Sequence, residues 1–430
     1  MKLHHLSRFF VSSLLGAALV PSTSMAQGAE QRFTIAVIPD TQNYLDYSHQ
    51  REAGFPIDAK DIFIDQMEYI ARNARSAGGD IVFATSVGDI WQHGSRSMDV
   101  EHVAKGLKAI PNPVFGNYLS PEPRTLTVEM PIARAGYEIL ASKLPFSVVP
   151  GNHDYDAVWS DSRWPATMKT GDPRSYGMLH YGGLDNFRAV FGSNSQFFKG
   201  KPWYVASFNG GADSAQVFEA GGYRFLHIGL EMAPEDDVIE WAQALLEKYP
   251  GIPTIISIHD HLNTEGERKP IAAVDFDAVH GEHNSPEELW QKLILRSDQI
   301  FMVLSGHQHG QSHATDKNAF GHDVHQILAD YQDRGQLLPM IAPEAPKAAL
   351  GDGWLRLMTF DFSTSNPTVS VQTYSTYFHT SSDRMTNYPT LYKQHEKPSE
   401  SDGAFRTEEN FTLNLADFNE RFSKAKVGTK

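Results

Sequence analysis

The chain has 430 residues, of which 41% are hydrophobic, and it carries a formal net charge of −15 with no cysteine. This composition is that of a globular protein and excludes a disordered or a membrane protein. The acidic balance disfavours polynucleotides and anionic membranes as partners, because tight binding to either needs clustered Lys and Arg. Without cysteine, a metal site must use His, Asp, Glu, Asn, Gln and water, which favours Mn, Fe or Mg, with Zn possible.

The N-terminus predicts an export signal. A short basic region with Lys2 and Arg8 is followed by an apolar run over residues 9–20 and by small residues that end at Ala26. This order is typical of a cleaved secretory signal, and the apolar run is too short to cross a bilayer. An ordinary N-terminal helix is the alternative. We expect residues 1–26 to be a signal peptide and the protein to be exported, either periplasmic or secreted, without a stable membrane anchor.

Short runs of β-branched and apolar residues end abruptly in polar turns, which is the pattern of strands buried on both faces. These runs predict strands over residues 33–38, 80–86, 145–149, 223–230, 254–258 and 299–304. Apolar residues at helical spacing predict helices over residues 59–76, 237–248 and 286–296. The alternation of strands and helices favours an α/β layered fold.

The remaining segments suggest how the domain is organised. Two alternating strands over residues 354–362 and 368–374 predict a hairpin. Residues 91–144 and 156–222 are rich in Pro, Gly and aromatic residues with weak periodicity, and we expect them to be two long functional insertions. We therefore predict one domain over residues 27–380. A polar C-terminal extension over residues 381–430 follows, with a linker over 397–403 and a short strand over 411–415.

Residues that can bind metal follow nearly every predicted core strand. They are Asp40 and Gln42 after the first strand, Asp89 after the second, Asn152, His153 and Asp154 after the third, His259 after the fifth, and His307 and His309 after the sixth. Ligands of open α/β sheets collect at the carboxyl ends of the strands, so these loops are expected to converge. Each motif alone has an ordinary structural explanation, such as capping of a turn. Their order and their shared position at strand ends indicate a metal site.

This order of motifs, D-x-Q, GD, GNHD, H and GHxH, resembles the calcineurin-like metallophosphoesterase family over roughly residues 33–375. The segments PDTQNY at 39–44 and LADYQ at 328–332 resemble an exported bacterial branch of that family. The resemblance implies a four-layer α/β/β/α sandwich. It also implies two divalent or trivalent metal ions and the hydrolysis of phosphomonoesters or phosphodiesters by metal-activated hydroxide.

The resemblance also assigns roles to the motif residues. The first metal ion would be held by Asp40, Gln42 and His309, the second by Asn152, His259 and His307, and Asp89 would bridge the two. His153 resembles the histidine that contacts the scissile phosphate and protonates the leaving group. Asp154 would either orient His153 or support its loop. A bridging anion is physically required, because two dications repel each other strongly at the short separation of such centres.

Three features leave alternatives open. Gln42 stands where the family more often has His, and an amide oxygen is a harder and usually weaker ligand, so Gln42 would hold a looser ion or none. His261 lies two residues beyond His259 and could replace it as a ligand. No Asp-Arg-Gly sequence follows Asp89, which disfavours a dedicated Ser/Thr protein phosphatase.

The predicted partner is a small phosphate ester, whose identity we expect the two insertions to determine. A non-catalytic metal-binding module on the same scaffold is the alternative from another functional class, and turnover of an aryl phosphate with added Mn would separate the two. An exported nucleotidase is a further option, although few residues are left for a specificity domain. The sequence leaves the oligomeric state open.

Overall fold

The computed structural model describes residues 31–116, 120–169, 173–269, 283–345 and 347–427. The predicted signal peptide, residues 1–26, lies outside the described residues. None of the described helices combines the length and the apolar character that a membrane crossing requires.

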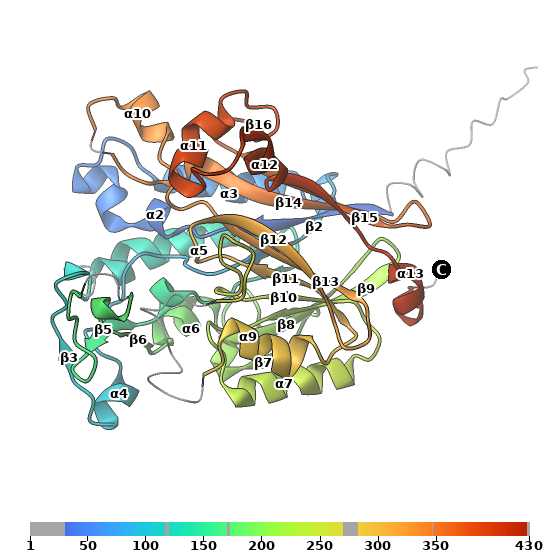
Figure 1. The fold of residues 1–430 in the computed structure, drawn as a ribbon, viewed down its shortest axis with the longest axis horizontal. Helices are drawn as coiled ribbons and strands as arrows, with labels where there is room; N and C mark the ends of the chain where they lie inside the picture. The colour runs from blue at the N-terminus through green and yellow to red at the C-terminus, as the bar shows by residue number, and fades with distance from the viewer. Residues whose placement is uncertain (1–30, 117–119, 170–172, 270–282, 346, 428–430) are drawn as a thin grey trace, which may run out of the picture.

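Two mixed sheets form the centre of the molecule (Figure 1). The first sheet has the strand order β16-β15-β14-β1-β2-β4, and β17 also pairs with β15. The strands are β1 (Arg32–Ile38), β2 (Ile81–Ser86), β4 (Phe146–Ser147), β14 (Trp354–Asp361), β15 (Thr368–Ser375), β16 (Thr380–Ser381) and β17 (Asn410–Asn414). Strands β1, β2 and β4 run parallel, whereas β14 pairs antiparallel with β1.

The second sheet has the order β12-β13-β11-β10-β9-β8-β7. Its strands are β7 (Tyr204–Phe208), β8 (Asp213–Ala220), β9 (Tyr223–Gly229), β10 (Thr254–Ser257), β11 (Ile300–Ser305), β12 (Gly310–Lys317) and β13 (Asp323–Asp330). The four central strands β9, β10, β11 and β13 are parallel. Strand β12 pairs antiparallel with β13, β8 pairs antiparallel with β9, and β7 pairs antiparallel with β8.

Three apolar cores define four layers. The faces of the two sheets that meet bury Phe33, Phe83 and Phe225 between them. On the outer face of the first sheet, α3 (Lys60–Arg72) and α5 (Met130–Ala141) pack against Ala36 and Ile38, the alternate residues of β1. On the outer face of the second sheet lie α7 (Asp236–Lys248) and α9 (Pro286–Leu289) (Figure 1). The predicted α/β/β/α sandwich is therefore confirmed.

The predicted core elements agree with the structure in most of their bounds. The six predicted strands correspond to β1, β2, β4, β9, β10 and β11, although β4 is reduced to two residues. The predicted hairpin is the antiparallel pair β14 and β15. The helix predicted over 286–296 is α-helical only to Leu289 and continues as a π-helical turn over Trp290–Ile294.

The two segments predicted as long insertions are only partly separate from the main body. Helix α5 packs on α3, and β7 and β8 complete the second sheet, so these elements belong to the sandwich. What remains is a small unit built from α4 (Val100–Ala104) and a three-stranded sheet of β3 (Ala109–Ile110), β5 (Ala157–Asp161) and β6 (Leu179–Gly182). Helix α6 (Asp185–Phe191) buries Phe187 and Phe191 against the core around α5.

The C-terminal segment packs closely on the body. Besides β17, it contains α11 (Tyr388–Glu396), α12 (Asp402–Thr407) and α13 (Phe418–Arg421), and α10 (Leu337–Ile341) precedes it. Phe418 and Phe422 enter the core between the two sheets. Arg421 donates hydrogen bonds to the backbone carbonyls of Asp298, Ile300 and Asp323. The segment can be polar in sequence because β17 is an outer strand. A few aromatic residues are enough to attach it to the body.

Candidate metal centre

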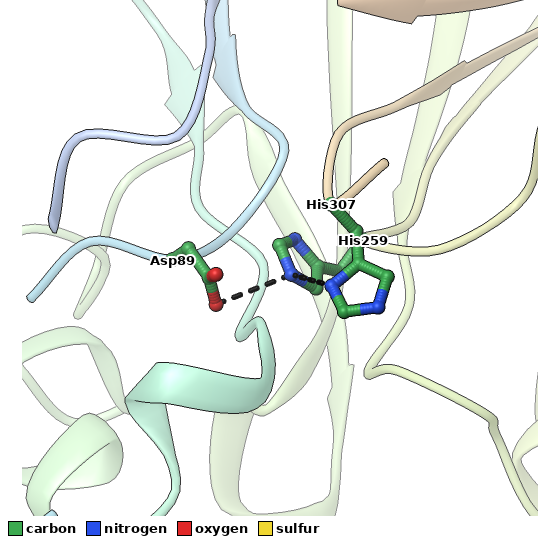
Figure 2. A group of neighbouring side chains, drawn as sticks. All are labelled: Asp89, His259 and His307. Carbon is green, nitrogen blue, oxygen red and sulfur yellow. Dashed lines mark hydrogen bonds and ion pairs between the residues drawn. The ribbon is translucent and has the colours of Figure 1, made fainter. Parts of the chain in front are cut away.

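Loops from both sheets converge at the carboxyl ends of their parallel strands. Figure 2 shows Asp89, which follows β2, facing His259 after β10 and His307 after β11. Asp89 Oδ1 lies 3.2 Å from His259 Nε2, and His307 Nδ1 lies 3.2 Å from the same nitrogen. All three residues are buried, and each offers a ligand atom within 4.8 Å of the others. One carboxylate and two imidazoles at this separation form a candidate metal-binding cluster.

Asn152 completes this cluster. It begins the 3-10 turn Asn152–Asp154, and its Oδ1 atom lies 3.0 Å from His259 Nε2. His259 Nδ1 donates to the carbonyl of Val87 at 2.8 Å, so Nε2 is the nitrogen that faces Asp89 and Asn152. The ring is thereby oriented by the loop after β2, as outer hydrogen bonds orient metal-binding histidines. The structure thus brings together the three residues predicted for the second metal ion and Asp89, the predicted bridging residue.

The residues predicted for the first metal ion are less closely gathered. Asp40 Oδ2 accepts a hydrogen bond from the backbone N–H of His307 at 3.2 Å, and Gln42 Nε2 donates to Asp89 Oδ2 at 3.1 Å. Gln42 lies at the start of the short helix α2 (Gln42–Leu45). His309 is instead held from the other side, where Asp333 Oδ2 accepts from its Nδ1 at 2.6 Å. Within the described residues, His309 makes no hydrogen bond to Asp40 or Gln42.

Several buried polar atoms in the cluster fit bound cations. Among the described residues, Asp40 Oδ1, Gln42 Oε1 and His307 Nε2 are buried without a hydrogen-bond partner. A buried acceptor without a partner is costly and rare in folded proteins, and an ion is one of its ordinary explanations. Carboxylate, amide and imidazole are also a suitable ligand set for Mn, Fe, Mg or Zn. The carbonyl oxygen of Gln42 is therefore available as a ligand atom.

Two motif glycines allow the loops to approach the carboxylates. A Cβ atom on Gly151 would collide with Asp89 Oδ1, and one on Gly306 would collide with Asp40 Oδ1. Asp89 and His307 also have positive φ angles of 51° and 71°, a backbone conformation that is strained for non-glycine residues. Such strain is maintained by surrounding structure and is typical of functional sites.

The centre brings several ionisable groups together in the interior. Burial would raise the pKa of Asp89, but the charges of His259 and His153 hold it below its ordinary value. Burial and the neighbouring Asp330 raise the pKa of Asp40 well above its ordinary value. Burial lowers the pKa of His259, but Asp89 and Asp40 raise it to about 10. Cations at this position would take the place of the protons that these groups otherwise share.

His153 and Asp154 have different surroundings. His153 Nδ1 donates to the carbonyl of Gln92 at 2.7 Å, and its Nε2 lies 3.7 Å from Asp89 Oδ2. The Asp154 carboxylate accepts backbone N–H groups from Ile90 at 2.9 Å and from Gly151 at 2.8 Å. Of the two roles predicted for Asp154, these contacts match support of the loops. The Gln92 carbonyl, which accepts from Nδ1, orients the His153 ring.

His261, the alternative ligand, faces away from the cluster. Its Nε2 donates to Gln326 Oε1 at 2.9 Å, in the interior of the second sheet. Of the two histidines after β10, the structure places His259 in the cluster.

Asp330, at the end of β13, and Gln332 and Asp333, which follow it, support the centre and were not predicted as site residues. Asp330 Oδ2 accepts the backbone N–H of His309 at 2.9 Å, and Gln332 Nε2 donates to His309 Nε2 at 2.6 Å, next to the contact from Asp333. The following Arg334 pairs with Glu396 and Glu409 of the C-terminal segment at 2.8 and 2.7 Å. The sequence feature that could have revealed these residues is the LADYQ segment, in which one more parallel strand ends in an acidic residue.

A cavity of about 530 Å³ opens above the cluster. Its polar floor includes Gln42, Asp89, Asn152, His153, His307 and His309. Its apolar wall comes from β6 and from the segments after β3 and before β6, and consists of Val114, Phe115, Tyr176, Leu179 and Tyr181. The volume falls within the range of about 300–1,000 Å³ that is usual for small-molecule sites.

The sequence model of the calcineurin-like phosphoesterases matches residues 33–311. The chain belongs to this family. A similar curated protein is the uncharacterized protein YvnB of Bacillus subtilis (strain 168), which is 29% identical over 242 residues. The match covers 55% of this chain but 15% of that relative, so the chain corresponds to a small part of the relative's length. Members of the family are metal-dependent hydrolases, and the cluster around Asp89 is the candidate metal centre of this member.

Replacement of Asp333 tests how His309 is held. We expect Asp333→Asn to weaken Mn²⁺ binding about 10- to 100-fold, because the carboxylate fixes the His309 ring and makes its other nitrogen a better donor. Isothermal titration of the metal-free protein measures the affinity, and the exposed Asp61→Asn is the matched control. Equal Mn²⁺ affinity in the wild type and in Asp333→Asn would show that Asp333 has no part in metal binding.

Proposed function

We propose that the protein hydrolyses small phosphomonoesters or phosphodiesters with two divalent or trivalent metal ions. Seven residues would hold them, namely Asp40, Gln42, Asp89, Asn152, His259, His307 and His309. The observation that carries the proposal is the buried meeting of four loops around Asp89, with acceptor atoms that lack a protein partner. When bound, the ions would lower the pKa of the attacking water and neutralise the phosphate oxygens.

The chain's own residues supply position and proton transfer. Asp89 contacts one residue of each predicted ligand set. One of its carboxylate oxygens contacts His259, and the other contacts Gln42. An anion in this position can hold two cations close together. His153 lines the cavity with its Nδ1 fixed by Gln92, so its Nε2 is placed to protonate a leaving alkoxide.

Electrostatics support a role for cations in substrate binding. Among the described residues that line the cavity, the ionisable groups on the floor are carboxylates and imidazoles, and none is Lys or Arg. The positive charge that a phosphate ester needs would therefore come from the metal ions at the centre of the floor. The presence of Asp89, Asn152 and His153 together also favours an enzyme over a non-catalytic metal-binding module.

We also propose that the protein acts outside the cytoplasm, in the periplasm or after secretion. The support is the basic, apolar and small-residue order of residues 1–26. The acidic composition supports a small phosphate ester, rather than a polynucleotide, as the substrate.

Asp89→Asn tests the bridging role directly. The amide removes the negative charge between the two ligand sets, so we expect the variant to retain fewer than two ions per chain and to lose turnover of bis(4-nitrophenyl) and 4-nitrophenyl phosphate. Elemental analysis and an Mn²⁺-supplemented assay give the two readouts, with the exposed Asp383→Asn as control. Two ions per chain in Asp89→Asn would refute the bridging role, and inactivity of the metal-loaded wild type on mono- and diester panels would refute the proposed function.

His153→Ala separates proton transfer from metal binding. We expect the variant to keep its metal and to lose about 10²- to 10⁴-fold in kcat on alkyl phosphates, whose alkoxide leaving groups need a proton. The loss on 4-nitrophenyl esters should be smaller, because nitrophenolate leaves without one. The exposed His395→Ala serves as control, and equal losses on both classes of leaving group would remove His153 as the acid.

A further inference from the structure

The cavity is larger than a phosphate group needs and has two chemically different sides. Its floor is the polar cluster, whereas its wall has Phe115, Tyr176, Leu179 and Tyr181 as its main apolar side chains. Leu179 and Tyr181 are buried, but Tyr176 is 46% exposed, although it is a large aromatic residue. Phosphate bound on the floor would leave the rest of the volume next to this wall.

The wall is held in place by a buried polar brace. Asn112 is 5% exposed and lies between the two segments that form the wall. Its Nδ2 donates to the carbonyl of Tyr176 and to Ser160 Oγ, both at 2.9 Å, and its Oδ1 accepts the backbone N–H of Val114 at 2.9 Å. One side chain thus fixes the Val114 segment to Tyr176 and to β5. A fixed wall binds with a smaller loss of conformational entropy than a mobile one.

The wall is also continuous with the floor. Tyr181 contributes its ring to the wall and lies beside Asn152, a predicted metal ligand that also lines the cavity. A substrate group attached to the phosphate would therefore contact the wall without leaving the cavity. Aromatic and aliphatic side chains favour an apolar or aromatic group at that position.

We propose that Phe115 and Tyr176 form a subsite for an aromatic or apolar group of the phosphate-ester substrate. The proposal rests on the proposed function, because it takes the phosphate to bind on the floor. It names the substrate class as phosphate esters that carry an aromatic or apolar organic group, in preference to esters of small or strongly polar alcohols. The small unit around β6 lies outside the four layers. In this proposal it determines the substrate specificity of the protein.

Two phosphonates test the subsite without depending on turnover. Phenylphosphonate and methylphosphonate have the same anionic group and differ in the apolar substituent. Isothermal titration of the Mn²⁺-loaded full chain should show phenylphosphonate binding roughly 10- to 100-fold more tightly, the ratio that burial of one aromatic ring gives. The double variant Phe115→Ala/Tyr176→Ala should reduce this ratio to below about threefold. Its affinity for methylphosphonate, which also reports that the floor is folded, should not change.

The control is Phe320→Ala, which removes a 58% exposed aromatic residue that does not line the cavity and should keep the full ratio. Equal affinities of the wild type for the two phosphonates would overturn the subsite while leaving the phosphate site intact. A full ratio in the double variant would overturn its assignment to Phe115 and Tyr176. Failure of the wild type to bind either phosphonate would instead contradict the proposed function, and the subsite with it.

Discussion

The structure depends on keeping the carboxylate of Asp89 charged in the interior, where four loops meet. Burial of a charge is costly unless partners surround it. Here the backbone N–H of His153, the amide of Gln42 and the ring of His259 all contact this carboxylate, at 2.9, 3.1 and 3.2 Å. Asp154, next to it, takes backbone N–H groups from both adjoining loops. The two sheets can bring these loops together because their parallel strands end on the same side.

Most of this arrangement follows from local sequence. Buried parallel strands are continuous apolar runs, so β1, β2, β9, β10 and β11 could be found without an alignment. A polar residue that follows such a run lies at the carboxyl end of the sheet, which is why Asp89 and His307 could be assigned to one site. The glycines before Asn152 and His307 are also informative, since only a residue without Cβ fits beside the carboxylates of Asp89 and Asp40.

Other features depend on contacts that no local pattern reveals. Strand β12 is polar because it is an edge strand, and β8 lies in a segment whose weak periodicity predicted an insertion. The orientation of His153 by a backbone carbonyl, rather than by Asp154, depends on the path of the loop after β2. The clamp between Arg334 and Glu409 joins residues far apart in the chain, so the link between the C-terminal segment and the segment after β13 could not be foreseen.

Anomalous diffraction from crystals grown with Mn²⁺ is the most direct test of the Asp89-centred site. The expected result is two peaks about 3.5–4 Å apart, on either side of the Asp89 carboxylate. One peak should lie against Asn152, His259 and His307, and the other against the set that includes Asp40. A single peak, or a pair of peaks that does not touch Asp89, would contradict the proposal that this carboxylate bridges two ions.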